Sequence, residues 1–165
     1  MKKLFSLSLV FLIVTGFFIF NQNRTSIASD KSECQLYFVD RQLHRLVPTV
    51  FIPEKSPEKT AKKMVSELIL GRDKNNAILR IIPNIEDGIS VKVKGDTAQV
   101  NLLGDLAKHI NKNAETEKLF IYQIVNSLTS VDGIKYVRFT IDSETKKDFV
   151  GFLDMREIFT ADYDI

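Results

Sequence analysis

The feature that most constrains the fold of this chain is an alternating ribbon at residues 89–102. Apolar residues occupy every second position on both sides of the dipeptide Gly95-Asp96, which suits a two-residue hairpin turn. A turn of that length fixes the register of the two strands. It predicts three apolar pairs across the ribbon: Val93 with Ala98, Val91 with Val100, and Ile89 with Leu102. We therefore expect an antiparallel hairpin with one buried face.

Two segments have the apolar period of a helix with one buried side. The first is residues 56–71, because Ser56 can cap free amides, Pro57 fits a first turn and Gly71 can end a helix. Its buried stripe is predicted to be Ala61, Met64, Val65, Leu68 and Ile69. The second helix runs from about Glu115 to Leu128. Its inner face is predicted to be Ile121, Ile124, Val125 and Leu128, and Asp132 with Gly133 turns the chain after it.

The remaining structured segments have the composition of β-strands. They are predicted at Gln35–Val39, Leu43–Phe51, Ile134–Ile141 and Phe149–Leu153. Pro48 places the second of these at a sheet edge or a bulge, since proline has no N–H to donate. The conformation of residues 72–88 stays open. The order predicts an α+β fold: a mixed or antiparallel sheet with two helices packed on one face, and an αββαβ core preceded by a strand pair.

The N-terminus has the composition of a membrane-targeting segment. Lys2 and Lys3 precede an uncharged run at residues 4–20, which predicts that the following domain lies on the outer side of a membrane. Residues 1–28 are therefore interpreted as a signal anchor, or as a signal peptide cleaved after Ala28. A buried helix of the domain is the alternative. Residues 29–34 would form a tether, and residues 35–160 a single domain.

The single cysteine and the balance of charge restrict which covalent links and which partners are expected for this chain. Cys34 is the only cysteine, so no internal disulfide can form, and the thiol offers a natural probe for labelling from outside the cell. It also lacks the small residues that precede a lipid-attachment site. The 23 basic and 21 acidic residues nearly balance, so composition does not call for nucleic acid as a partner.

A search for catalytic residues finds few candidates. Asp105 and His109 could share a helix face as half of a metal site, and His44 lies on a predicted edge strand, between Leu43 and Arg45. Asp40, Asp154 and Glu157 could supply paired carboxylates for acid–base work on a polysaccharide. No ligand set or nucleophile motif surrounds them, so we expect no catalytic residue, no metal and no cofactor.

Several short motifs, in order, resemble the GerMN family of sporulation and spore germination domains. They are Leu68-Ile69-Leu70-Gly71, Ile82-Pro83, Val100-Asn101-Leu102, the segment with Leu128, Thr129, Val131, Gly133, Ile134 and Val137, and finally Gly151, Leu153 and Asp154. The sequence departs from the family pattern at Asp142 and Ser143, where a glycine-containing turn is commoner. It also lacks the lipid-attachment cysteine of many members.

The resemblance implies a fold similar to the ring-building domains of envelope assemblies. It also implies a non-catalytic, membrane-anchored scaffold outside the cytoplasm, which binds envelope or sporulation-complex proteins or copies of itself. The alternative function is a cell-wall hydrolase or a ligand-binding domain.

Overall fold

The computed structural model describes residues 33–42, 44–71, 77–85 and 87–165. They belong to one compact unit, Ser32–Ile165. The predicted membrane segment at residues 4–20 and most of the predicted tether lie outside the described residues. Within the described part, no helix is long and apolar enough to cross a membrane.

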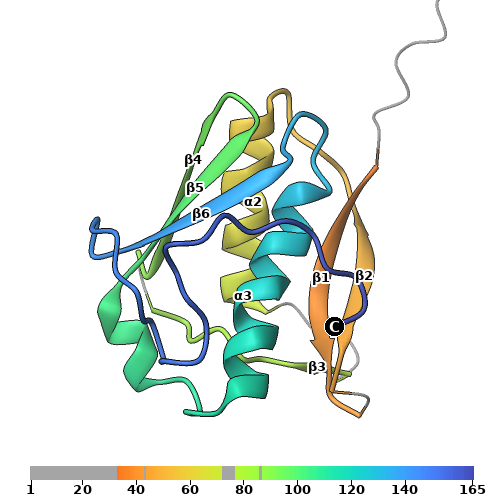
Figure 1. The fold of residues 1–165 in the computed structure, drawn as a ribbon. Coiled ribbons are helices and arrows are strands. Elements are labelled where there is room, and N and C mark those ends of the chain that lie inside the picture. The colour runs from red at the N-terminus through yellow and green to blue at the C-terminus, as the bar shows by residue number, and fades with distance from the viewer. Residues whose placement is uncertain (1–32, 43, 72–76, 86) are drawn as a thin grey trace, which may run out of the picture. The chain divides into compact units, whose positions relative to one another are not determined.

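The unit contains two α-helices and two three-stranded sheets (Figure 1). The first sheet has the order β2-β1-β3 and consists of β1 (Cys34–Asp40), β2 (Leu46–Phe51) and β3 (Ile78–Leu79). The second has the order β4-β5-β6 and consists of β4 (Ile89–Lys94), β5 (Thr97–Leu102) and β6 (Tyr136–Ile141). The helices are α2 (Pro57–Leu70) and α3 (Ala114–Thr129), and a short 3-10 helix, η1 (Gly104–Lys108), follows β5.

The alternating ribbon forms the predicted hairpin. Val93 pairs with Ala98, Val91 with Val100 and Ile89 with Leu102. Gly95 has a φ of 62°, which the tight turn requires and which glycine adopts without strain. α3 then crosses over, so that β6 runs parallel to β5. The predicted order of helix, hairpin, helix and strand is confirmed.

The predicted ends of α2 are confirmed as well. The Ser56 hydroxyl accepts a hydrogen bond from the Lys59 N–H, and Pro57 occupies the first turn. Gly71 ends the helix in the left-handed conformation, with a φ of 54°. Ala61, Met64, Val65 and Leu68 are buried, whereas Ile69 is only partly buried at the edge of the stripe.

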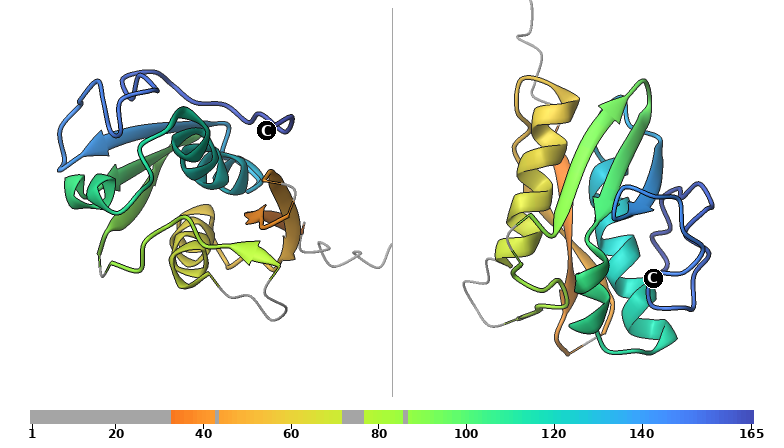
Figure 2. Two further views of the ribbon diagram at one scale, coloured as in Figure 1. Left: turned by 90° about the horizontal axis from the view of Figure 1, so that it is seen from below. Right: turned by 90° about the vertical axis from the view of Figure 1, so that its left-hand side faces the viewer.

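The α+β fold is confirmed, but its strands form two sheets. Figures 1 and 2 show α2 and α3 between these sheets. One side of the helix pair covers the β4-β5-β6 sheet, and α3 also packs against β1 on the other side. The main core fills the space between these layers, with Phe120, Ile121, Ile124 and Leu128 of α3 completely buried. Neither of the two described α-helices lies on the opposite face of the β4-β5-β6 sheet (Figure 2).

Ser127 of α3 and Ser130, the residue directly after this helix, complete one edge of β1. The Ser127 hydroxyl accepts a hydrogen bond from the Tyr37 N–H at 2.9 Å. The Ser130 hydroxyl accepts one from the Gln35 N–H, also at 2.9 Å. β3 pairs only with Val39 and Asp40. The serines thus replace a neighbouring strand along the first half of β1.

β2 is an edge strand, and Pro48 lies on it opposite Tyr37. This confirms the predicted position of the proline. β2 begins at Leu46 rather than at Leu43, because the chain first turns at His44, whose φ is 50°. The His44 N–H donates to the Asp40 carbonyl in this turn.

The strand predicted at Phe149–Leu153 is wrong. The N–H groups of four residues donate to the Glu117 carboxylate instead of to a neighbouring strand: Val150 at 2.8 Å, Gly151 at 3.4 Å, Phe152 at 2.7 Å and Leu153 at 3.1 Å. Amides that converge on one carboxylate cannot also face a strand ladder. The segment is therefore a loop wrapped around a buried side chain of α3.

The chain after this loop runs back over the domain from one sheet to the other. We call residues 154–165 the C-terminal strap. Phe159 pairs with Val137 at the outer edge of β6. Asn126 of α3 holds the main chain of Asp162 through two hydrogen bonds, and the Ile165 carbonyl accepts from the Leu46 N–H of β2. The strap thus covers parts of both sheets.

Candidate functional site

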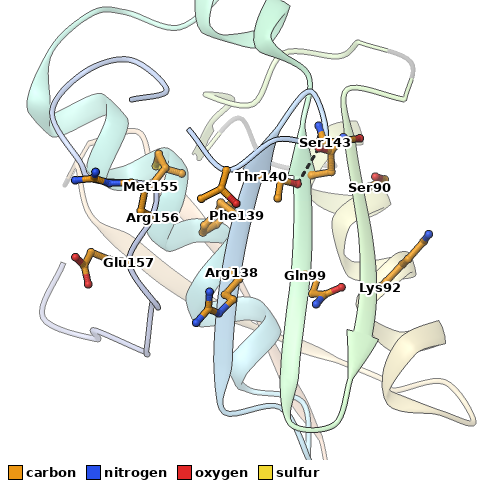
Figure 3. Close-up of a pocket in the computed structure, with 12 residues that line it drawn as sticks. Ser90, Lys92, Gln99, Arg138, Phe139, Thr140, Ser143, Met155, Arg156 and Glu157 are labelled. Carbon is orange, nitrogen blue, oxygen red and sulfur yellow. Dashed lines mark hydrogen bonds between the residues drawn. The ribbon is translucent and has the colours of Figure 1, made fainter. Parts of the chain in front are cut away.

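The candidate site is a pocket of about 420 Å³ on the uncovered face of the β4-β5-β6 sheet (Figure 3). Its floor consists of the residues that alternate with the buried positions of the three strands: Ser90 and Lys92 on β4, Gln99 and Asn101 on β5, and Arg138 and Thr140 on β6. Met155, Arg156 and Glu157 of the strap form a wall beside β6. The strand residues whose side chains point away from the core therefore line this pocket.

Two large side chains extend this surface beyond the pocket. Tyr136 is 39% exposed and shares its strand face with Arg138. Ile158 is 48% exposed and precedes the buried Phe159, so it is directed to the opposite side of the strap. We use the term open face for the pocket residues together with Tyr136 and Ile158.

Positive charge predominates in the pocket. Lys92, Arg138 and Arg156 line it with one acidic residue, Glu157. Arg156 is already paired, because its guanidinium donates to both oxygens of Asp154, at 2.9 and 2.5 Å. These bonds lower the pKa of Asp154 to about 2. Lys92 and Arg138 are thus the cations available to an approaching anionic group.

A strained turn forms one end of the pocket. Asp142 and Ser143 have φ angles of 54° and 67°, which non-glycine residues seldom adopt. The Asn101 side-chain oxygen accepts hydrogen bonds from the Ser143 N–H and from the Thr140 hydroxyl. The Gly104 N–H donates to Asp142, and this bond, with help from Lys146, lowers the pKa of the Asp142 carboxyl. Tertiary hydrogen bonds thus hold the turn in a conformation that glycine would adopt without strain.

The wall of the pocket depends on Glu117. This carboxylate is completely buried, and its four N–H donors shape the loop that leads directly into the strap. Met155 is also buried, and its N–H donates to the Lys147 carbonyl. Glu117 therefore positions Arg156 and Glu157 without itself lining the pocket.

The acidic candidates from the sequence are only partly brought together. Asp154 and Glu157 share a turn of the strap, in which the Glu157 N–H donates to the Asp154 carbonyl. Asp40 lies at the end of β1 in the other sheet, where its carboxylate accepts from the Gln42 N–H. Paired carboxylates facing one cleft are not formed by these three residues.

The histidine candidates lie on the surface. The His109 Nε2 is 3.6 Å from an Asp105 oxygen, and both side chains are 54% exposed. Lys108 binds the same carboxylate at 2.7 Å and is the main reason that the pKa of Asp105 is lowered. His44 is exposed in the turn before β2. Among the described residues, no group of three or more histidine, cysteine or acidic side chains is placed to hold a metal.

Cys34 is unsuited to the labelling experiment for which the sequence recommends it. The residue is only 2% exposed, and burial raises the pKa of its thiol. An impermeant reagent needs an exposed thiolate, so topology has to be tested with an introduced cysteine.

Of the residues that line the pocket, Glu157 alone is among the candidates selected from the sequence. The sequence did contain a pattern that indicates part of this lining. The polar members of the alternating ribbon are Ser90, Lys92, Gln99 and Asn101. The ribbon pattern shows that they face away from the core, but not that β6 and the strap add Arg138 and Glu157 beside them. That arrangement joins segments far apart in the chain.

The profile of the Germane family, described as sporulation and spore germination, matches residues 35–147. This chain belongs to that family. Membership in the GerMN (Germane) family confirms the resemblance drawn from the short motifs, although the motif at Gly151, Leu153 and Asp154 lies beyond the matched range. No curated protein matches the chain.

Solved structures share the GerMN fold. The first GerMN domain of the sporulation protein GerM from Bacillus subtilis is 20% identical, with a TM-score of 0.60, over 78% of this chain and 96% of that domain. The tandem GerMN domains of the same protein give a TM-score of 0.61 at 20% identity, over 78% of this chain and 45% of that one. A candidate lipoprotein from Clostridium perfringens is 22% identical, with a TM-score of 0.56, over 78% of this chain and 86% of that protein. At these identities the likeness concerns the fold.

Proposed function

We propose that this GerMN domain is a non-catalytic module that acts in sporulation or spore germination by binding an envelope protein through its open face. Residues 4–20 would hold it at the outer side of the cell membrane. The family is associated with sporulation and spore germination, and one solved relative is a candidate lipoprotein, which supports an envelope location.

The observation that carries this proposal is the composition of the open face. Tyrosine and arginine are enriched where proteins bind each other, and Tyr136 and Arg138 lie together here beside the exposed Ile158. The helices leave this side of the sheet uncovered. A partner could therefore reach the strands without any rearrangement of the domain.

No observation favours the alternative of a cell-wall hydrolase. Such an enzyme commonly needs two carboxylates that flank the bond to be cleaved. Of the residues that line the described pocket, Glu157 alone carries a carboxylate. The buried Glu117 is saturated by main-chain donors and so has a structural role.

Photo-crosslinking in the source organism tests the proposal. A photoreactive phenylalanine analogue replaces Gln99, which is exposed on the open face, or Lys118, which is exposed on α3 as a matched control. We expect an adduct with another envelope protein from position 99 only, at the stage of sporulation or germination. The proposal fails if neither position gives an adduct, or if both give the same one, while deletion of the gene leaves sporulation and germination unchanged.

Membrane topology is tested separately with an exposed cysteine. The full chain carrying Cys34→Ala and Lys112→Cys is treated on intact protoplasts with an impermeant thiol reagent, since Lys112 is exposed. Labelling before lysis is expected for a domain outside the membrane. Labelling only after lysis would contradict the proposed orientation.

A further inference from the structure

The outer edge of β6 has a gap in its hydrogen bonding. The N–H and C=O of Val137 both bond to Phe159 of the strap, at 2.9 Å each. Four residues further along β6, the Ile141 N–H donates to the Glu144 carbonyl at 2.8 Å. Because these groups alternate along a strand, the N–H and C=O of Phe139 point to the same outer edge. Within the described residues, neither group has a partner there.

The C-terminal strap does not pair with β6 beside Phe139. The pairing of Val137 with Phe159 would bring Glu157 opposite Phe139 if the strap continued as a strand. The Glu157 N–H instead donates to the Asp154 carbonyl at 3.3 Å, in the turn that also contains Arg156. The strap therefore covers β6 at Phe159 and turns away beside Phe139.

The gap opens into the pocket on the open face. Phe139 lines this pocket, opposite Met155 and Glu157. Its side chain is buried and contacts the Phe159 ring edge to face, with the ring centres 5.3 Å apart. Its main-chain N–H and C=O thus lie at the edge of the sheet beside the pocket, where a strand-like ligand can reach them. A ligand that offers both a C=O and an N–H would satisfy them.

Charge defines the side chains of such a ligand. Side chains of a strand added beside β6 would point alternately to the two faces of the sheet. Every second side chain would lie on the open face beside Arg138 and Thr140. The others would point to the buried face, where Met155 and Phe159 lie. Arg138 has no acidic partner among the ion pairs that the described residues form, and Lys92 lies on the same sheet face. An acidic side chain next to Arg138 and an apolar neighbour therefore fit best.

We propose that the gap beside Phe139 binds an extended, acidic peptide segment of the partner protein. Its main chain would pair with the N–H and C=O of Phe139, and its carboxylate would contact Arg138. This inference rests on the proposed function, because it specifies the chemistry by which the open face recognises its partner. This mode of peptide binding is strand addition. The bridges at Val137 and Ile141 limit the added strand to a short length.

Peptide binding to the full chain in detergent micelles tests the inference. The probe is acetyl-Glu-Val-Glu-amide, whose valine would pair with Phe139 and whose glutamates would lie on the open face, and its counterpart with lysine in place of glutamate is the charge control. With ¹⁵N-phenylalanine labelling, the spectrum has at most 12 signals, and a Phe139→Leu variant identifies that of Phe139. We expect a saturable shift of the Phe139 amide signal with the acidic peptide only, and weaker binding as salt is raised.

Two variations separate main-chain pairing from attraction between charges. A peptide that is N-methylated at the central residue and both of its neighbours should lose the Phe139 shift, because it can no longer donate to the strand. Arg138→Gln should weaken binding of the unmodified peptide about fivefold to tenfold, whereas Lys118→Gln on exposed α3 should leave it unchanged. Equal binding of the methylated peptide, equal binding of the lysine peptide, or no shift at millimolar peptide would each overturn the inference.

This experiment and the crosslinking experiment fail independently. A crosslink from position 99 without peptide binding would leave the open face as the docking surface and exclude strand addition at Phe139. Peptide binding without any crosslink in cells, together with unchanged sporulation and germination when the gene is deleted, would support the chemistry of the gap and contradict the proposed role in the envelope.

Discussion

The two sheets of this domain complete their hydrogen bonding in different ways. In the β4-β5-β6 sheet, each strand pairs with its neighbour over all six residues. In the β2-β1-β3 sheet, β3 pairs with only two residues of β1, and the side chains of Ser127 and Ser130, at the end of α3, take the place of a strand along the rest of that edge. The β4-β5-β6 sheet is therefore built from main-chain ladders, whereas one edge of β1 in the other sheet depends on particular side chains brought in by the tertiary structure.

The same contrast applies within the C-terminal part of the chain. Phe159 joins the edge of β6 through main-chain bonds, whereas residues 150–153 are held by the Glu117 carboxylate. A ladder bond survives most substitutions, because every residue except proline supplies the same groups. A bond to a buried side chain is lost with that residue. The comparison therefore predicts where single substitutions should be most costly.

The largest effect is expected at Glu117. Glu117→Ala removes the acceptor of four N–H groups and leaves a buried space, so the free energy of unfolding should fall by roughly 3–5 kcal/mol. Glu115→Ala, two residues earlier and exposed, should change it by less than about 0.5 kcal/mol. Denaturant unfolding of both variants measures the difference. Equal effects would show that the loop does not depend on this carboxylate.

The next largest effect is expected at Ser127. Ser127→Ala deprives the Tyr37 N–H of its acceptor in a buried position, which should cost about 1–3 kcal/mol. Hydrogen exchange of the Tyr37 amide should accelerate in the variant. Ser66→Ala, at an exposed position of α2, is the control and should be neutral or slightly stabilising, because alanine favours helix. If both serine variants behaved alike, α3 would not be replacing a strand beside β1.

A smaller effect of the opposite sign is expected at the turn after β6. Ser143→Gly should stabilise the domain by about 1 kcal/mol, because glycine adopts a φ of 67° without the steric cost that serine has. Gly95→Ala provides the mirror experiment in the hairpin and should destabilise by a similar amount. A loss of stability in Ser143→Gly would mean that the serine side chain contributes more than its backbone strain costs.

The smallest effect is expected from the ion pair of Asp154 with Arg156. Folding lowers the pKa of Asp154 from 3.8 to about 2, so its contribution is present above pH 3.8 and is lost as the pH falls towards 2. The pair is largely solvent-exposed, so the contribution is small. The difference in Tm between the wild type and Asp154→Asn should therefore shrink as the pH falls from about 5 to about 2. A constant difference would indicate that the asparagine acts through packing or the turn rather than through charge.

Local patterns predicted the elements whose hydrogen bonds close within a short stretch of chain. The hairpin register follows from Gly95-Asp96, and the ends of α2 follow from Ser56 and Gly71. The predicted second helix differs from α3 by only one residue at each end. In each case the residue that determines the structure is adjacent to the structure it determines.

The errors arose where a distant residue competed for the same backbone groups. The apolar run at Phe149–Leu153 resembles a buried strand, but Glu117, which is more than 30 positions earlier, binds its amides. The apolar period of α3 places Glu117 on the buried face, four residues before Ile121, but it does not show which main-chain amides the carboxylate binds. The pocket was missed for the same reason, because Arg138, Glu157 and the ribbon residues meet only after α3 has crossed over and the strap has returned.

The sequence by itself determined the α+β class, the hairpin and its register, the helix ends and membership in the GerMN family, because these depend on neighbouring residues and on the order of short motifs. Only the tertiary structure decided that the strands divide into two sheets, that serines complete β1, that Glu117 shapes a loop, and that Phe139 faces a gap in the edge of β6. These features depend on which buried polar groups find partners, and those partners lie tens of residues apart in the chain.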